Sequence, residues 1–346
     1  MKTNNNIPSY RFQGYTDAWE LRKLGEVAEV TKLAGFEFTE HVVYSEEGNI
    51  IALRGLNIKD GRLVLDDVKY IDGSNFSKLN RSKLYVDDIM FTYVGTVGEV
   101  AIIKENDRFY LAPNVSRIRV QSEDSSKFIS HYIRSEFFYN RVIFPLIATS
   151  SQPALSMENI RKFDIFLPII NEEQIRISEL FDTLDQQITL HQRKLDTLKE
   201  QKKTYLKLLF PAKGQTKPAL RFQGFEDDWE EVKLGDVVNI QKGTQRGKQE
   251  ISEIQSEQFP YPVYNGGQNV SGYTDEYNRE NMVIISEGGA SAGYVNYYSG
   301  KFWSGGHNFS IDNLDNNLLY IKSILEFNQQ KLYELKVGSG LPNVQL

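Results

Sequence analysis

The sequence has 346 residues, of which 40% are hydrophobic and 25% charged, no cysteine, and a formal net charge of −6. The lack of cysteine excludes a disulfide framework, a thiol nucleophile and a cysteine-based zinc site. The N-terminal residues form no apolar run, and no stretch approaches the roughly 18 apolar residues of a membrane helix. We therefore expect a cytoplasmic protein that has no membrane partner.

The first domain is expected over residues 1–170, because the length allows about two domains of roughly 150 residues each. It opens on RFQGYTDAWELRKLGEVA at residues 11–28. Alternating apolar and polar residues then predict strands, and a run with helical spacing predicts a helix at 126–143. The expected strands cover residues 49–53, 62–65, 88–93, 99–103 and 116–120. This mixture predicts an α+β domain.

A long helix is predicted over residues 171–210, between Pro168 and Pro211. Its apolar residues recur in alternating steps of four and three, which is the heptad pattern of a coiled coil. The apolar seam positions are Ile177, Phe181, Leu184, Ile188, Leu195, Leu198, Tyr205 and Leu209, and His191 and Lys202 interrupt them. Asn171 and Gln174 are expected to form a capping box. The alternative is an ordinary amphipathic helix packed on a globular core.

The second domain is expected over residues 211–346, where the opening phrase returns at residues 221–238 as RFQGFEDDWEEVKLGDVV. The two copies align without gaps at an offset of 210 residues. Identical pairs include Arg11/Arg221, Phe12/Phe222, Gly14/Gly224, Asp17/Asp227, Trp19/Trp229, Lys23/Lys233, Leu24/Leu234 and Gly25/Gly235. Strands near 281–286 and 292–298 and a helix at about 315–336 follow. Because both tryptophans belong to the shared phrase, we expect them to anchor the fold or a partner contact.

Two features together resemble the specificity subunit of type I restriction-modification enzymes: the phrase RFxGFxxxWxxxKLGxV, and the segment LPIINEEQ feeding a long helix, with Leu167, Pro168, Glu173 and Gln174. The resemblance covers essentially the whole chain. It implies two target-recognition domains that each read half of a split double-stranded DNA site, and helices that fix the gap between the halves. It also implies methyltransferase and motor-nuclease subunits as partners. S-adenosylmethionine, ATP and Mg²⁺ would then belong to those partners, and this chain would hold no cofactor.

The sequence departs from the family pattern in one respect. That pattern has a second spacer helix after the second recognition domain, and we find no equivalent of it up to residue 346. A fragment, a truncated gene and pairing with a second copy of this chain each explain it. The net charge of −6 counts against a protein that binds DNA by itself. It is compatible with one that shares the neutralisation of phosphates with partner chains.

The candidate DNA contacts are basic, amide and aromatic side chains in turns or at strand ends, because bases are read by bidentate side chains and phosphates are held by cations and hydroxyls. In the first domain they are Arg54, Lys78, Arg81, Lys83 and Tyr93. In the second they are Lys242, Thr244, Gln245, Arg246, Lys248, Asn265, Gln268 and Asn269. Solvated turns and hairpin chemistry explain these patterns equally well.

Motifs of catalysis are missing from the sequence: there is no phosphate-binding GxxxxGK[ST] loop, no amino-methyltransferase Asn-Pro-Pro-Tyr motif and no metal-ligand spacing among the four histidines. We expect a non-catalytic subunit and no metal site. Two alternatives remain open. The chain could be a coiled-coil adaptor that does not read DNA, or a truncated donor of recognition domains that acts with a second copy.

Overall fold

The computed structural model describes residues 6–147, 153–313, 317–337 and 343–344. The chain divides into two compact units, unit 1 (Met1–His191) and unit 2 (Gln192–Leu346). Helix α6 (Asn171–Leu209) contributes its first part to unit 1 and its last part to unit 2.

The central sheet of unit 1 has four antiparallel strands in the order β2-β10-β7-β8. Their bounds are β2 (Ala28–Lys32), β10 (Val115–Val120), β7 (Ile89–Thr92) and β8 (Val100–Ile102). One core cluster contains side chains of this sheet and of helix α3 (Ser126–Arg134), including Phe91, Ile118 and Phe128, which are at most 2% exposed. Burial of this apolar surface is the main force that holds the helix on the sheet.

A second core in unit 1 forms around a three-stranded sheet, in the order β6-β3-β9. Here β3 (Ile51–Leu53) pairs in parallel with β9 (Phe109–Leu111) and antiparallel with β6 (Lys69–Tyr70). Because β3 and β9 run in the same direction, their carboxyl ends lie at the same edge of the sheet. Smaller pairs, β1 (Glu20–Lys23) with β11 (Asp164–Leu167) and β4 (Ile58–Lys59) with β5 (Arg62–Leu63), complete the strands of unit 1.

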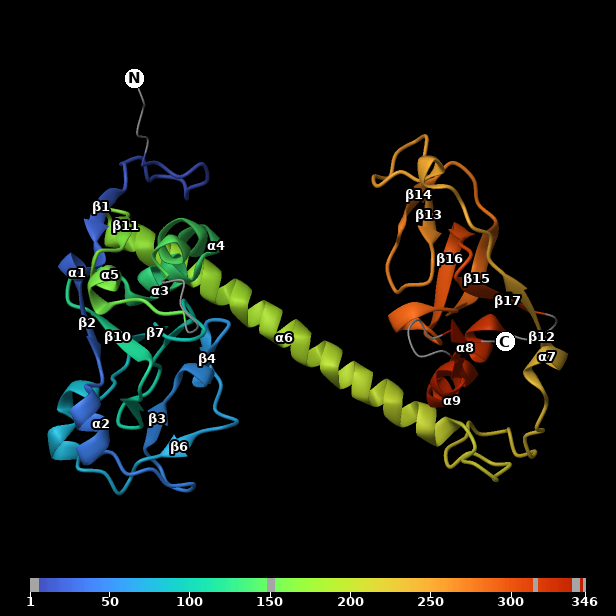
Figure 1. Ribbon diagram of the computed structural model, residues 1–346, viewed down its shortest axis with the longest axis horizontal. Coiled ribbons are helices and arrows are strands. Elements are labelled where there is room, and N and C mark those ends of the chain that lie inside the picture. Colours follow the sequence, from blue (N-terminus) through green and yellow to red (C-terminus); the bar gives the residue numbers. More distant parts are fainter. Residues whose placement is uncertain (1–5, 148–152, 314–316, 338–342, 345–346) are drawn as a thin grey trace. The chain divides into compact units, whose positions relative to one another are not determined.

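Unit 2 has one six-stranded sheet in the order β12-β17-β15-β16-β13-β14. The strands are β12 (Val238–Lys242), β17 (Asn308–Asn313), β15 (Arg279–Ser286), β16 (Val295–Ser304), β13 (Tyr261–Tyr264) and β14 (Gly272–Thr274). Helices α8 (Leu318–Phe327) and α9 (Gln329–Glu334) contribute Ile321, Leu325 and Leu332 to the same core as the sheet. Figure 1 shows both helices beside the sheet.

The two units have the same topology. The order β2-β10-β7-β8 in unit 1 corresponds to β12-β17-β15-β16 in unit 2, and the parallel pair β3/β9 corresponds to β13 and the end of β16. The helical turns α1 (Leu24–Val27) and α7 (Leu234–Val237) keep the offset of 210 residues. The predicted duplication of one α+β module is therefore confirmed well beyond the shared opening phrase.

The paired tryptophans anchor the same turn in each unit. The amide of Trp19 donates to the carbonyl of Asn6, and the amide of Trp229 donates to that of Thr216, both at 2.8 Å and again 210 residues apart. Trp19 meets Phe128 edge-on at 5.6 Å, and Trp229 meets Tyr320 at 6.2 Å. Of the two predicted roles, an anchor of the fold is confirmed, and a partner contact stays a prediction.

All five predicted strands of unit 1 and both predicted strands of unit 2 are present, with shifts at their ends. The helix predicted at 126–143 is interrupted at Ser135, whose hydroxyl accepts from the amide of Phe138 and begins a new turn. The helix predicted at 315–336 breaks at Asn328 into α8 and α9, and residues 314–316 lie outside the described residues. Serine and asparagine side chains compete for backbone hydrogen bonds, which explains why these helices stop there.

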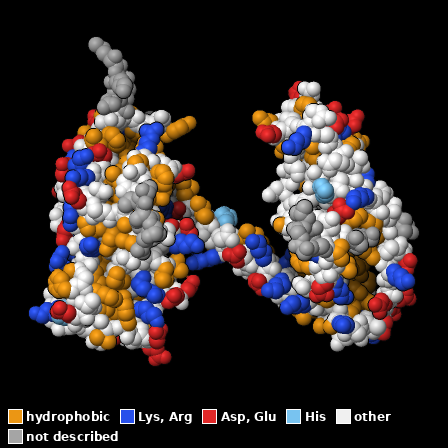
Figure 2. All heavy atoms as spheres, in the orientation of Figure 1, with side chains coloured by type: hydrophobic (Ala, Val, Ile, Leu, Met, Phe, Trp, Pro, Cys, Tyr) orange, Lys and Arg blue, Asp and Glu red, His pale blue; other side chains and the backbone are white. Residues whose placement is uncertain are grey.

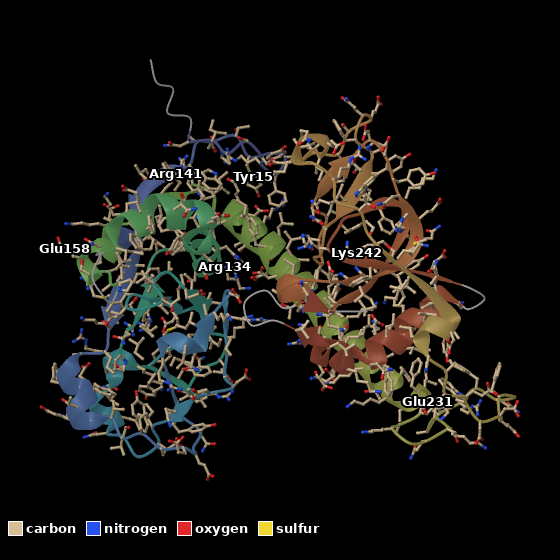
Figure 3. The ribbon with its side chains drawn as sticks, turned by 45° about the vertical axis from the view of Figure 1, so that its right-hand side comes forward. Tyr15, Arg134, Arg141, Glu158, Glu231 and Lys242 are labelled. Atoms are coloured by element: carbon tan, nitrogen blue, oxygen red, sulfur yellow. The ribbon has the colours of Figure 1, made fainter. Side chains whose placement is uncertain are left out.

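Helix α6 is one unbroken element over Asn171–Leu209, as predicted (Figure 1). The capping box was wrong, because Asn171 donates to the carbonyl of Glu123 and the side chain of Gln174 contacts Ser125, Asp124 and Pro168 instead. Both residues thus fasten the start of the helix to the loop before α3. His131 and Arg134 of α3 also contact Asp182 and Asp185 of α6, at 2.9 and 2.5 Å (Arg134 is labelled in Figure 3).

The predicted seam of α6 is largely exposed to solvent. Ile177 packs against the core of unit 1, and the ring of Phe181 lies 5.5 Å from that of His131. Five seam residues beyond Phe181 are about half exposed or more: Leu184 46%, Ile188 67%, Leu195 45%, Leu198 51% and Tyr205 51%. The last seam residue, Leu209, is less exposed. Hydrophobic side chains and charges of both signs share the visible face of this helix in Figure 2. Its pairing with another helix stays a prediction.

Candidate nucleic-acid interface

The first candidate position in each unit follows the parallel strand pair. In unit 1 the amide of Ala112 donates to the carbonyl of Leu53, the last residue of β3. In unit 2 the amide of Gly305 donates to the carbonyl of Tyr264, the last residue of β13. The next residues, Arg54 and Asn265, therefore occupy equivalent places in the two modules. Both residues were predicted as DNA contacts, but their equivalence was not predicted from the sequence.

A second pair of equivalent positions lies beside the first, at the turn that leads into β10 or β17. The amide of Tyr93 donates to the carbonyl of Asn114, and the amide of Glu287 donates to that of His307. Tyr93 follows β7 and Glu287 follows β15. The backbone of this region is thus retained in both units, while the side chains that it carries differ.

A returning segment closes the same region in both units. The amide of Leu155 donates to the carbonyl of Tyr93 at 2.8 Å, and the amide of Val344 donates to that of Glu287 at 2.7 Å. The hairpins that follow β7 and β15 also match, since Gly98 donates to Thr92 and Gly293 to Ser286. These hydrogen bonds define one structural frame with variable side chains, which we call the reading edge of each unit. It is marked by Arg54, Tyr93, Asn114 and Leu155 in unit 1 and by Asn265, Glu287, His307 and Val344 in unit 2.

Both reading edges keep a lysine, at the end of β2 in unit 1 and of β12 in unit 2. The ammonium of Lys32 lies 5.5 Å from the centre of the Tyr93 ring. Lys242, which is labelled in Figure 3, forms an ion pair with Glu287, whose other oxygen lies 3.9 Å from the ring of His307. Burial raises the pKa of Tyr93 above its ordinary value, so its hydroxyl stays protonated and can donate a hydrogen bond at neutral pH. Both units have a lysine at this position, but the side chains beside it differ between the units.

The reading edge of unit 1 lines a cavity of about 570 Å³, whose walls include Tyr44, Arg54, Lys59, Thr96 and Asn114. Arg54 donates through Nη2 to the carbonyl and the carboxylate of Asp67, at 2.9 and 2.8 Å. Its Nε is buried and has no hydrogen-bond partner among the described residues. In unit 2 the buried Oδ1 of Asn265 likewise has none. Each edge therefore carries at least one buried polar atom that the described residues do not satisfy.

The predicted basic cluster lies outside the reading edge: Lys78 and Arg81 are in the 3₁₀ turns η2 (Phe76–Lys78) and η3 (Asn80–Ser82), and Lys83 directly follows η3. Arg81 reaches Thr31 at 3.4 Å, and Lys83 forms an ion pair with Asp107 at 2.7 Å. That hydrogen bond raises the pKa of Lys83, so the ammonium stays charged. These residues remain candidate contacts, with two of the three already engaged within the protein.

The predicted basic loop of unit 2 folds back on the sheet. The side chain of Arg246 is only 9% exposed, stacks on the ring of Trp303 at 4.5 Å and donates to Asp275 and Glu276. The indole of Trp303 donates to the carbonyl of Thr244, and the amide of Gly243 donates to Asn308. This arrangement gives Arg246 a structural part in the loop, and sequence pattern alone could not reveal its partners.

The other predicted contacts of unit 2 lie in two turns. Gln245 donates to the carbonyl of Arg246 at 3.3 Å, and Lys248 begins the 3₁₀ turn η6 (Lys248–Glu250). Gln268 and Asn269 are exposed in the turn that links β13 to β14. The structure brings Asn265 and Lys242 to the reading edge and leaves Gln268 and Asn269 at the tip of a hairpin.

An apolar groove of about 590 Å³ lies in unit 2, lined by Tyr205 and Leu209 of α6 and by Phe222, Trp229 and Tyr320. In unit 1 the counterpart of Trp229, Trp19, belongs to the core against which Ile177 of α6 packs. The shared arginine also differs in its partner. Arg11 forms two hydrogen bonds with the buried carboxylate of Glu173, and Arg221 donates to the carbonyl of Asp227.

No group of three or more histidine or acidic side chains that could hold a metal ion occurs among the described residues. Within the same part of the chain, no helix is long and apolar enough to cross a membrane. The candidate site therefore consists of hydrogen-bonding and cationic side chains on two copies of one frame.

This architecture defines a protein of two equivalent α+β modules joined by a long helix. The family model for the type I restriction modification DNA specificity domain matches residues 16–200 and 226–346, and the chain belongs to that family.

Individual relatives are more distant. The Type I restriction enzyme MjaVIII specificity subunit of Methanocaldococcus jannaschii is 25% identical over 205 residues, which cover 58% of this chain and 47% of that protein. S.MpnORF638P of Mycoplasma pneumoniae is 28% identical over 123 residues, or 34% of this chain and 32% of that one. The chain therefore spans about half or less of these relatives' lengths.

A solved structure has the same fold. The S subunit of a type I restriction-modification system from M. genitalium superposes with a TM-score of 0.67 and 17% identity, over 96% of this chain and 80% of that one.

Proposed function

We propose that this chain is the DNA-recognition subunit of a type I restriction-modification complex, and that it reads a split double-stranded site. The observation that carries the proposal is the repetition of one frame with different side chains at the same positions, as in Arg54 and Asn265. Two equivalent frames suit two contacts of the same kind, and different side chains suit two different sequences. An unbroken helix of 39 residues, about 58 Å long, suits a spacer between them.

In this proposal the catalytic work belongs to partner subunits. Methyltransferase subunits would supply the S-adenosylmethionine site, and motor-nuclease subunits the sites for ATP and Mg²⁺. This chain holds the two reading edges against the DNA, and their position determines where a partner's active site acts. Its net charge of −6 is compatible with this proposal if partner chains share the phosphate contacts, because affinity for DNA comes largely from neutralised phosphates.

The test is methylome sequencing of cells that lack other DNA methyltransferases and express this chain with its cognate methyltransferase subunit. We expect a motif of two short halves, separated by a fixed number of unspecified base pairs. A chain that only links two proteins would leave methylation without a split motif. Cells that express the methyltransferase alone are the control, and we expect no motif from them.

A second copy of this chain is a further partner that we propose, with antiparallel pairing of the two α6 helices. The exposed apolar seam supports it, because residues such as Leu195 and Leu198 are half exposed in the single chain. Replacing both with Asp should shift the purified chain from dimer to monomer in analytical ultracentrifugation. Leu190→Asp is the matched control, since Leu190 is 59% exposed but lies off the seam. Equal sedimentation of the seam variant and the native chain would contradict the pairing.

A further inference from the structure

We infer that Arg54 and Asn265 are the equivalent base-reading residues of the two modules, Arg54 for a guanine in one half of the DNA site and Asn265 for an adenine in the other. The inference rests on the proposed function and adds residues and base identities to it. Arg54 directly follows β3, which pairs in parallel with β9. Asn265 directly follows β13, which pairs in parallel with the end of β16. The strand pairing that leads to this place is the same in either unit, and the side chain that follows it differs.

The unsatisfied atoms indicate which base each residue takes. Arg54 has a buried Nε donor without a partner among the described residues, and guanine offers the two acceptors O6 and N7 to an arginine. Asn265 has an unsatisfied Oδ1 acceptor, and adenine offers the N6 amino donor together with the N7 acceptor, which matches a carboxamide. A buried polar atom without a partner is unfavourable, so a ligand that supplies the partner gains binding energy.

Neighbouring groups position the two side chains. Asp67 holds Nη2 of Arg54 from one end, so the planar guanidinium has a fixed direction and Asp67 acts as a positioning residue. Beside Asn265 lies Gly305, where a Cβ atom would come within 2.4 Å of Oδ1. Only glycine leaves room for the carboxamide at this distance, and the terminal torsion of asparagine is soft enough to turn the amide toward a base.

Charges around each edge agree with a DNA ligand. Lys32 and Lys242 occupy the same place in the frame and suit a phosphate, which is the part of DNA that does not vary with sequence. Two carboxylates near the edges have partners within the protein, since Glu287 pairs with Lys242 and Glu99 accepts from the amide of Asp60. The lysine found in both edges thus positions the DNA through its phosphates. The two differing residues, Arg54 and Asn265, determine which base is read.

The experiment uses the full chain with its methyltransferase partner and compares Arg54→Ala with Asn265→Ala. Methylome sequencing should show that Arg54→Ala relaxes one G·C position in one half of the motif, and that Asn265→Ala relaxes one A·T position in the other half. Binding to the native DNA site, measured by fluorescence anisotropy, should weaken by roughly 10- to 100-fold for each variant. Gln330→Ala in unit 2, where Gln330 is exposed, and Arg108→Ala in unit 1, where the Arg108 side chain is 43% exposed, are the matched controls and should leave motif and affinity unchanged.

Conservative variants guard against misfolding. Arg54→Lys keeps the charge and loses the bidentate fork, and Asn265→Gln keeps the amide at a different reach, so each should relax the same base pair as the alanine variant. A uniform loss of affinity on all DNA sequences would assign these residues to phosphate and overturn the inference. So would a motif that stays unchanged in the alanine and conservative variants. If the native chain itself directs no split motif, the proposed function fails and the base assignment fails with it.

Discussion

Inserting four helix-forming residues after Lys199 of α6 should widen the gap in the methylated motif by one or two base pairs and leave both halves unchanged. Four residues lengthen the helix by about 6 Å, which is less than two base-pair rises of about 3.4 Å. They also turn everything beyond the insertion by about 40°, close to the rotation of one base pair in a duplex with 10–10.5 base pairs per turn. Methylome sequencing reads both the gap and the halves directly.

The control for this insertion keeps the helix length. Gln192 bonds to Asp196 on the exposed surface of α6, and replacing both with Ala removes that contact without lengthening the helix. We expect the native gap from this variant. A helix that served only to tether two modules would tolerate the insertion with no change in the gap, and that result would contradict the role of α6 as a spacer.

The long helix could be predicted almost to the residue because its signal is local and repeated. Apolar residues recur through α6, and Pro168 and Pro211 mark the ends of the segment. The contacts at the start of the helix could not be predicted. The pattern at Asn171 and Gln174 has the spacing of a capping box, yet the loop before α3 offers both side chains tertiary partners. Local rules do not contain that information.

Several strands were missed for a different reason. β13 reads YPVY, and a proline inside a run argues against a strand by local rules. β2 and β12 read AEVTK and VNIQK, which are too short and polar to be distinctive. Their partners in the sheet decide their conformation, because strand propensity depends mostly on packing against neighbouring strands.

The equivalence of the two reading edges was hidden by loop length. The shared phrase keeps an offset of 210 residues, but the offset is 211 between Arg54 and Asn265, 193 between Asn114 and His307, and 189 between Leu155 and Val344. An ungapped comparison loses such positions as soon as the loops differ. The backbone hydrogen bonds recover them, since they depend on strand order and not on sequence. Arg54 and Asn265 were thus predicted singly, and only the fold relates them to each other.

The arginine of the shared phrase should contribute much to the stability of unit 1 and little to that of unit 2. Arg11 donates through Nε and Nη2 to Glu173 at 2.6 and 2.7 Å, and Glu173 is fully buried in the first turns of α6. Glu173→Ala leaves the guanidinium with no carboxylate in a nearly buried place, which should lower the free energy of unfolding of unit 1 by about 3–5 kcal/mol. Glu172→Ala, one residue earlier, breaks only the exposed pair with Arg176 and should cost about 0.3–0.5 kcal/mol.

The same comparison can be made across the repeat, with one residue type in one sequence context. Arg11→Ala should destabilise unit 1 strongly, and Arg221→Ala should affect unit 2 weakly, because Arg221 makes an exposed hydrogen bond to the carbonyl of Asp227 and has no buried carboxylate partner among the described residues. Since a chain of two units need not unfold in one step, hydrogen exchange measured by mass spectrometry should follow each unit separately during denaturant unfolding. We expect faster exchange at the start of α6 and in residues 6–23 for Glu173→Ala and Arg11→Ala. Equal losses from Arg11→Ala and Arg221→Ala would show that the buried pair does not fasten the helix to its module.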